Sequence, residues 1–392
     1  MQQLEQQVTA KMQLARRHDL DWLRVLAVLL LVYFHTAAIF YSGPLGEFYV
    51  TNGLSSRELS LFILLVHQWH MPLFFLLSGA ATWFALGYRT GTEYINNRFR
   101  RLFIPFLFGT LVVVPPQVYY RLSSHPDYQK SYLQFYPQFF NGIRPQGNFE
   151  WAHLWFIVYL FVFSLIALPL FLHLRKSVAA SLLSKLAAFC ESLGVIFLLG
   201  VPLAVIEGAL RPRWPGLQNL YDDWANFLLY LFYFIYGYLI CSDTRFTQAI
   251  DRHLRIALLM AIASMSVLLV LSMTNILPLR GYSLENVLYQ GFRGFNSWFW
   301  VVALLGLGRR YLNFNSGILQ YANEASYPFY ILHQTVIVTI GFYVVRWSAG
   351  VVEKFWVIST TSLIITIVLY ELVIRRNNMT RFLFGLKPIS SN

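Results

Sequence analysis

The strongest constraint on the fold of this chain is a series of apolar runs, each long enough to cross a membrane. The hydrocarbon core of a bilayer takes about 20 apolar residues of helix, and every backbone polar group inside it must be paired internally. Ten runs meet this description: about 20–42, 60–86, 102–122, 152–173, 193–210, 225–241, 255–274, 290–308, 325–346 and 354–374. The sequence therefore predicts an all-α, polytopic transmembrane helix bundle of about ten helices.

The charge distribution predicts how this bundle is oriented. Only 12% of the residues are charged, against roughly 25% in soluble domains, and the net charge is +12. If the N-terminus is cytoplasmic, the cytoplasmic segments hold 19 Lys and Arg residues and the external segments hold ten. This bias predicts that both termini are cytoplasmic, and it explains the basic charge without a nucleic-acid partner.

The domain organisation that follows is simple. Residues 1–19 form a cytoplasmic segment, 20–374 the membrane-embedded domain and 375–392 a cytoplasmic tail. A cleaved signal peptide is the competing interpretation of the first run, but the run is too long and contains Arg24. The short loops leave no room for a soluble catalytic module, so any chemistry is expected within the bundle.

The first apolar run carries three ionisable residues, Asp21, Arg24 and His35. A helix turns about 100° per residue, which places Arg24 about 20° from His35 on one side and Asp21 about 40° from it on the other, so all three share one stripe. The rise per residue puts Arg24 near the cytoplasmic side and His35 about 16 Å further out. Asp21 and Arg24 are compatible with a simple interfacial ion pair. His35 has two interpretations: a buried structural hydrogen bond, or a functional group on a polar pathway.

Four other histidines are candidates for a site. His67 and His70 are three residues apart in the second run, but a metal pair needs a third ligand, so no metal is predicted. His153 follows Glu150 at the outer side, where the two could line an acceptor pocket. His333, in the ninth run, is expected in the cytoplasmic half. A structural hydrogen bond remains open for each histidine.

Arg98 and Arg101 belong to a basic cluster, NNRFRRLFIPF, at the start of the third run. A positive-inside cluster beside a helix is one interpretation. The other follows from the guanidinium group, which binds phosphate in a bidentate manner. Such a cluster at the cytoplasmic mouth of a bundle suits an anionic, phosphate-bearing cofactor.

The second run contains the tetrapeptide LSGA, Leu77–Ala80. It lacks the GxSxG pattern of a nucleophile elbow, so a serine triad is not predicted. Ser78 and Gly79 are small and permit the close approach of a neighbouring helix.

Taken together, these motifs resemble the acyltransferase-3 family of integral-membrane acyltransferases. The matching stretches are DWLRVLAVLLLVYFH, HMPLFFLLSGAATWFAL, RFRRLFIP, HLWFIVYL and SYPFYILHQ, which follow the family's order between residues 21 and 334. Arg24 and His35 match the family's Arg-x10-His pattern, and Arg98 and Arg101 match its RxxR pattern. HMPLFFLLSG and FHTAAIFYS look most similar to the glucan-biosynthesis protein C branch, which is associated with succinylation of periplasmic glucans.

The resemblance implies an O-acyltransferase of the bacterial cytoplasmic (inner) membrane. Such a protein moves an acetyl or succinyl group from cytoplasmic acyl-CoA to a hydroxyl of an envelope carbohydrate at the outer face. His35 is then the catalytic base or the acyl carrier, and Arg24, Arg98 and Arg101 hold the CoA donor. Asp21 is expected to pair with Arg24, and Glu150 to orient the acceptor or assist His35.

Two other function classes remain open from the sequence. Intramembrane Asp, Arg and His residues also suit a proton-coupled transporter or a flippase. A structural or sensory membrane protein is the third class. The expected partners are the lipid bilayer, acyl-CoA and the carbohydrate acceptor, and a homo-oligomer is compatible with the sequence.

Overall fold

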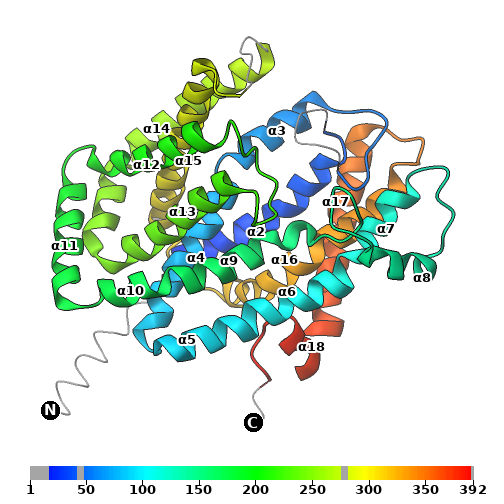
Figure 1. Cartoon of the computed structure of the whole chain (residues 1–392), viewed down its shortest axis with the longest axis horizontal. Coiled ribbons are helices and arrows are strands. Elements are labelled where there is room, and N and C mark those ends of the chain that lie inside the picture. The colour runs from blue at the N-terminus through cyan, green and yellow to red at the C-terminus, as the bar shows by residue number, and fades with distance from the viewer. Residues whose placement is uncertain (1–16, 42–47, 275–280, 390–392) are drawn as a thin grey trace.

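The computed structural model describes residues 17–41, 48–274 and 281–389 (Figure 1). Within these ranges the regular elements are helices, and the one isolated β-bridge joins Ile143 and Phe149. The predicted all-α class is confirmed. The predicted cytoplasmic segment 1–19 lies largely outside the described residues.

The helices of the first half of the chain include two π-helical stretches and two short 3₁₀ helices. In order they are α2 (His18–Ala38), α3 (Arg57–His67), α4 (His70–Gly87), α5 (Gly91–Arg98), η1 (Phe99–Phe103), α6 (Ile104–Phe108), η2 (Gly109–Val113), α7 (Pro115–Ser123), α8 (Tyr132–Phe135), η3 (Tyr136–Phe140), η4 (Ala152–Leu154), α9 (Trp155–Ile166) and α10 (Leu168–Leu174).

The second half contains the longest helices. It comprises α11 (Ser177–Glu191), η5 (Val195–Leu199), α12 (Gly200–Leu210), α13 (Trp224–Ser242), α14 (Thr244–Thr274), α15 (Leu284–Tyr311), α16 (Gly317–Val344), α17 (Val351–Leu369), η6 (Tyr370–Ile374) and α18 (Asn378–Leu383). Every one of the ten predicted apolar runs coincides with one or more of these helices.

Not every predicted run meets the length and hydropathy expected of a membrane span. Among the described residues, six helical stretches do: His18–Ala38, Arg57–Gly87, Gly91–Ser123, Trp224–Ser242, Thr244–Thr274 and Val351–Ile374. A seventh is reached if α9 with its preceding turn and α10, which are bent by 46°, count as one span. The apolar stretch Val195–Leu210 is short, and α15 and α16 carry more polar residues. The count of ten spans and the cytoplasmic termini remain predictions.

Helix α2 lies in the interior of the bundle, where α16 is one of its main partners (Figure 1). Near its start, Arg24 Nη1 donates to Asn323 Oδ1 of α16 at 3.2 Å. Further along, the ring centroids of His35 and His333 are 5.1 Å apart. Because both contacts advance in the same order along the two helices, α2 and α16 run side by side in the same direction.

Helices α4 and α13 approach each other closely through two glycines. A Cβ atom built on Gly79 would lie 1.8 Å from the Phe234 carbonyl oxygen, and one built on Gly237 would lie 1.8 Å from the Leu76 carbonyl oxygen. Only residues without a side chain allow this separation. The close helix approach predicted at Gly79 is therefore confirmed.

The third apolar run contains the two π-helical stretches, each of which ends just before a proline. Pro105 has no N–H, so the carbonyl of Arg101 loses its usual helical partner, and Ile104 N bonds instead to Phe99 O. Pro115 likewise leaves the Leu111 carbonyl without its helical N–H partner. This carbonyl accepts a hydrogen bond from the Tyr136 hydroxyl at 3.0 Å instead. Such π-helical turns occur frequently at functional sites, and the first carries part of the arginine cluster.

Candidate active site

Three histidines from distant parts of the chain meet in the bundle. His35 comes from α2, His153 from η4 and His333 from α16, and the His333 ring centroid is 5.1 Å from each of the other two. The expectation that His333 occupies the opposite half of the bundle from His35 is wrong. Helix α16 begins at Gly317 rather than near residue 325, because its first two turns are polar, and His333 consequently lies in mid-helix.

The hydrogen bonds of two of these histidines fix their tautomers. His153 Nε2 lies 2.9 Å from Ile331 O, and a carbonyl only accepts, so Nε2 carries the proton. Its Nδ1 then accepts from Gln117 Nε2 at 3.4 Å. His333 Nδ1 lies 2.6 Å from Tyr330 O and donates to it. The Nε2 atom of His333 is therefore an unprotonated acceptor when the ring is neutral.

The acceptor nitrogen of His333 is buried, and no hydrogen-bond partner for it is found among the described residues. Of the two imidazoles beside it, His153 already uses both ring nitrogens. His35 is thus the neighbouring imidazole that can donate a proton to it. His333 is fully buried whereas His35 is half-buried, so His35 is the member of the pair that a substrate can reach.

Aromatic rings and a charged group lie around His35 at the end of α2 that is away from Arg24. Phe48 stacks on it with centroids 5.8 Å apart. The next residue, Tyr49, donates its hydroxyl hydrogen to Glu150 at 3.0 Å. Burial and the Glu150 carboxylate raise the pKa of Tyr49 well above its usual value, so its hydroxyl stays protonated.

Glu150, a predicted catalytic residue, is held by two cations. Its carboxylate lies 2.8 Å from Arg121 Nη1 and 2.7 Å from Arg144 Nη1. Its link to His35 runs through Tyr49 and Phe48 rather than through a direct hydrogen bond in the described structure. A role in orienting the acceptor or assisting His35 remains a prediction.

Asp21 and Arg24 lie at the other end of α2. Arg24 Nη1 is 3.3 Å from Asp21 Oδ1, so the predicted ion pair between them forms. Asp21 is 14 residues from His35, which corresponds to about 21 Å along the helix. Any effect of Asp21 on the reaction must therefore act through Arg24 and not through contact with His35.

The structure brings the two predicted RxxR arginines to the same part of α16 as Arg24. Arg98 Nη2 donates to Thr82 Oγ1 at 2.9 Å, and its guanidinium lies 4.7 Å from the centroid of the Tyr94 ring. Tyr327, one turn beyond the Arg24 partner Asn323, lies within electrostatic range of Arg98 and Arg101.

No carboxylate pairs with Arg98 or Arg101 among the residues that the structure describes. Guanidinium groups stay charged in proteins, and Arg89 lies within electrostatic range of Arg101 as a third cation. Uncompensated like charges at this position suit an anionic ligand.

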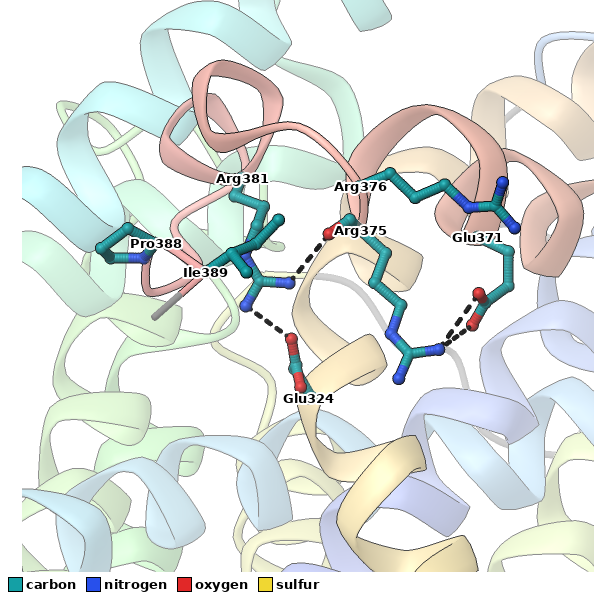
Figure 2. Close-up of a pocket in the computed structure, with 7 residues that line it drawn as sticks. All are labelled: Glu324, Glu371, Arg375, Arg376, Arg381, Pro388 and Ile389. Atoms are coloured by element: carbon teal, nitrogen blue, oxygen red, sulfur yellow. Dashed lines mark hydrogen bonds and ion pairs between the residues drawn. The ribbon is translucent and has the colours of Figure 1, made fainter. Parts of the chain in front are cut away.

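A pocket of about 590 Å³ opens beside this cluster, between α16, η6 and α18 (Figure 2). Two ion pairs frame it: Arg381 with Glu324 at 2.7 Å, and Arg375 with Glu371 at 3.0 Å. Figure 2 draws no interaction for the guanidinium of Arg376. The chain beyond α18 packs on the cluster, since a Cβ built on Gly385 would lie 2.9 Å from Arg101 O.

The other histidine pair does not act as one unit. His70 Nε2 donates to Ala27 O at 2.8 Å, which is a structural bond between α4 and α2. His67 lies before the break between α3 and α4 and lines a separate cavity. Across the described ranges, no group of three His, Cys, Asp or Glu side chains could hold a metal ion.

Sequence reasoning missed several polar partners of the site. Asn323 and Tyr327 on α16, Tyr49 beside the outer loop, and the buried amide of Gln117 were not predicted to take part. Gln117 in the apolar stretch VVVPPQVYY could have indicated a polar site, because a buried amide needs hydrogen-bond partners. The partner of each side chain, however, depends on which helices face each other.

Comparisons with known proteins identify the family of the chain. The family model Acyl_transf_3, described as an acyltransferase domain, matches residues 17–371, which include every histidine and arginine predicted for the site. Glucans biosynthesis protein C of Escherichia coli K12 is 25% identical over 392 residues, covering 95% of both chains. Its namesake in Salmonella typhi is 24% identical, with the same coverage. No solved structure matches the chain. The protein therefore belongs to the acyltransferase-3 family.

Proposed function

We propose that this protein transfers an acetyl or succinyl group from cytoplasmic acyl-CoA to a hydroxyl of an envelope carbohydrate at the outer face of the bacterial inner membrane. The observation that carries the proposal is the position of half-buried His35 beside fully buried His333, whose Nε2 has no partner among the described residues; the two ring centroids are 5.1 Å apart. The relatives named for glucan biosynthesis support a glucan or a similar polysaccharide as the acceptor.

The donor enters from the arginine end of α2 and α16. Arg24, Arg98 and Arg101 bind the phosphates of CoA, since guanidinium groups pair with phosphate in a bidentate manner. The thin pantetheine arm then follows α2 toward His35, which lies about 16 Å from Arg24 along the helix. The pocket in Figure 2 adjoins this entrance and offers further guanidinium groups to the nucleotide part of the donor.

The reaction needs a base that accepts the proton of the acceptor hydroxyl, and it needs the hydroxyl oxygen to attack the thioester. His35 removes the proton from the acceptor hydroxyl, whose oxygen attacks the thioester carbonyl carbon. The new C–O bond forms as the C–S bond breaks, and the CoA thiolate leaves with the proton that His35 held. In a two-step variant, His35 itself carries the acyl group before the acceptor attacks.

His333 acts on this reaction through His35. We propose that during the reaction its Nε2, which has no partner in the described structure, accepts the N–H of the His35 ring and so directs the other, basic nitrogen of His35 toward the acceptor. This is the logic of an orienting partner in general-base catalysis, in which a second group fixes the tautomer of the base. On the outer side, Tyr49, Glu150 and Arg144 form a hydrogen-bonded rim suited to a hydroxyl-rich acceptor.

The test is a comparison of envelope glycans by mass spectrometry in cells that carry the wild-type protein, His35→Ala or no protein. We expect one acetyl or succinyl mass per modified site with the wild type, and its loss in His35→Ala at unchanged protein level in the membrane. His173→Ala, which changes an exposed histidine on α10, serves as the matched control. Full modification in His35→Ala would contradict the assignment.

A further inference from the structure

A second polar cavity lies between the α3–α4 break and the helices α12, α13 and α15. Its volume is about 100 Å³, and its lining includes Gln68, Glu207, Arg211 and Arg293. That volume holds a few water molecules or one small organic acid, and it excludes a nucleotide or a sugar chain. The cavity is distinct from the arginine cluster at the start of α2.

Charge is not balanced inside this cavity. Arg211 Nε lies 3.2 Å from both carboxylate oxygens of Glu207, and the two side chains are 9% and 4% exposed, so they form a nearly buried ion pair. Arg293 has only amide partners: its Nη1 donates to Gln290 Oε1 at 2.6 Å and its Nε to Gln68 Oε1 at 3.4 Å. In the described parts of the chain, no carboxylate lies within ion-pair distance of Arg293, so the charged side chains that line the cavity, Glu207, Arg211 and Arg293, carry one net positive charge.

An uncompensated cation inside an apolar bundle is costly unless a ligand completes it. The amide oxygens of Gln68 and Gln290 hold the Arg293 guanidinium without neutralising it, and Nη2 has no hydrogen-bond partner among the described residues. A planar guanidinium with open N–H groups matches a carboxylate best. Arg293 is half-buried and Pro215 at the rim is exposed, so the cavity can be entered.

The break between α3 and α4 connects this cavity with the histidine site. Gln68 lies in the break and lines the cavity. Two residues later, the ring of His70 lies 6.1 Å from the ring of Phe34, the neighbour of His35. A group bound at Arg293 is therefore linked to the reaction centre through Gln68, His70 and Phe34.

We propose that this cavity binds a small carboxylate carried by one of the two substrates, with Arg293 as its counter-ion. The assignment to a substrate rests on the proposed function. The carboxylate has two possible sources: the free end of a dicarboxylic acyl group on the donor, or an anionic substituent on the acceptor. An acetyl group has no such end, so in the first case Arg293 determines acyl specificity.

The binding test uses free succinate and its neutral analogue succinamide on the purified protein in lipid nanodiscs. We expect the wild type to bind succinate and not succinamide. Arg293→Gln should weaken succinate binding about tenfold to a hundredfold, as expected for loss of a charged hydrogen bond. Arg213→Gln, an exposed arginine outside the lining, should leave it unchanged.

Equal binding of succinate and succinamide by the wild type would overturn the proposal without any variant. So would unchanged succinate affinity in Arg293→Gln. If that variant does not fold, Arg293→Lys keeps the charge but removes the planar fork. It should retain succinate binding with a several-fold loss, and unchanged affinity would again count against the site.

Transfer assays with succinyl-CoA and acetyl-CoA, each to a neutral glucan and to an anionic glucan, identify the source. If the carboxylate belongs to the donor, Arg293→Gln lowers kcat/KM for succinyl-CoA and leaves acetyl-CoA unaffected. If it belongs to the acceptor, both donors lose rate together, and only with an anionic acceptor. No transfer by the wild type from either donor would refute the proposed function. The carboxylate site itself is decided by the succinate-binding test, which does not depend on transfer.

Discussion

At the scale of single residues, His333 provides the sharpest prediction. Its Nε2 is buried without a partner, and its Nδ1 is already committed to Tyr330 O. Replacing it with Ala removes the acceptor that directs His35, so we expect kcat for transfer to fall about tenfold to a hundredfold. KM for acyl-CoA should stay constant, because His333 does not touch the donor.

The matched control is His333→Gln, whose amide oxygen can still accept a hydrogen bond. It should recover a measurable part of the lost kcat, whereas a purely structural role would leave both variants equally impaired at equal thermal stability. A change in KM without a change in kcat would exclude the orienting role.

The donor arginines allow a second prediction at this scale. Arg101 has no carboxylate partner in the described residues, and Arg100 beside it is exposed. We expect Arg101→Gln to raise KM for acyl-CoA about tenfold with little change in kcat, since one charged contact to phosphate is lost. Arg100→Gln should behave as the wild type in the same steady-state assay. Equal KM values for the two variants would contradict a donor-binding role and would leave the cluster as a determinant of membrane orientation only.

The sequence could single out His35 and the arginines as candidates because each departs from the pattern around it. A histidine or arginine in an apolar run is expensive, and helical geometry alone shows which residues share a stripe on one helix. Geometry within one helix does not show which helices face each other. The contact between the His35 and His333 rings, and the ion pairs of Glu150 with Arg121 and Arg144, both depend on tertiary packing.

At the scale of helices, the contact between α4 and α13 should be the least tolerant of change. A Cβ on Gly237 would lie 1.8 Å from Leu76 O, which is backbone and cannot rotate away. We expect Gly237→Ala to destabilise the protein by about 2–3 kcal/mol or more, at the upper end of overpacking costs. The measurement is the unfolding midpoint in detergent.

Gly87, at the end of α4, is the matched control. A Cβ there would meet nothing within 4 Å, so Gly87→Ala should be neutral or slightly stabilising. Equal midpoints for Gly237→Ala and the wild type would mean that the two helices do not approach as closely as described.

Helix existence could be predicted well and helix ends less well. All ten apolar runs coincide with helices because hydropathy reports the apolar interior of each. It does not report polar turns that extend a helix, which is why α16 begins at Gly317 and His333 was placed in the wrong half. It also does not report the π-helical turn before Pro105, which arises from a missing N–H.

At the scale of the whole molecule, the polar groups separate into two ends. Arg24, Asn323, Tyr327 and the chain after α18 gather at one end of α2 and α16. Glu150 with its two arginines lies toward the other end, beyond His35. If acyl-CoA is the donor, the arginine end must face the cytoplasm and the Glu150 end must face outward. Topology and function are therefore tested by the same measurement.

The measurement is thiol labelling of single-cysteine variants in intact spheroplasts with a membrane-impermeant reagent. In a background with Cys190 and Cys241 changed to Ser, we compare Lys130→Cys in the outer loop with Lys387→Cys after α18, both exposed positions. We expect Lys130→Cys to react in intact spheroplasts and Lys387→Cys to react only after permeabilisation. The reverse pattern would place the arginine end outside, where acyl-CoA is absent, and would refute the proposed donor.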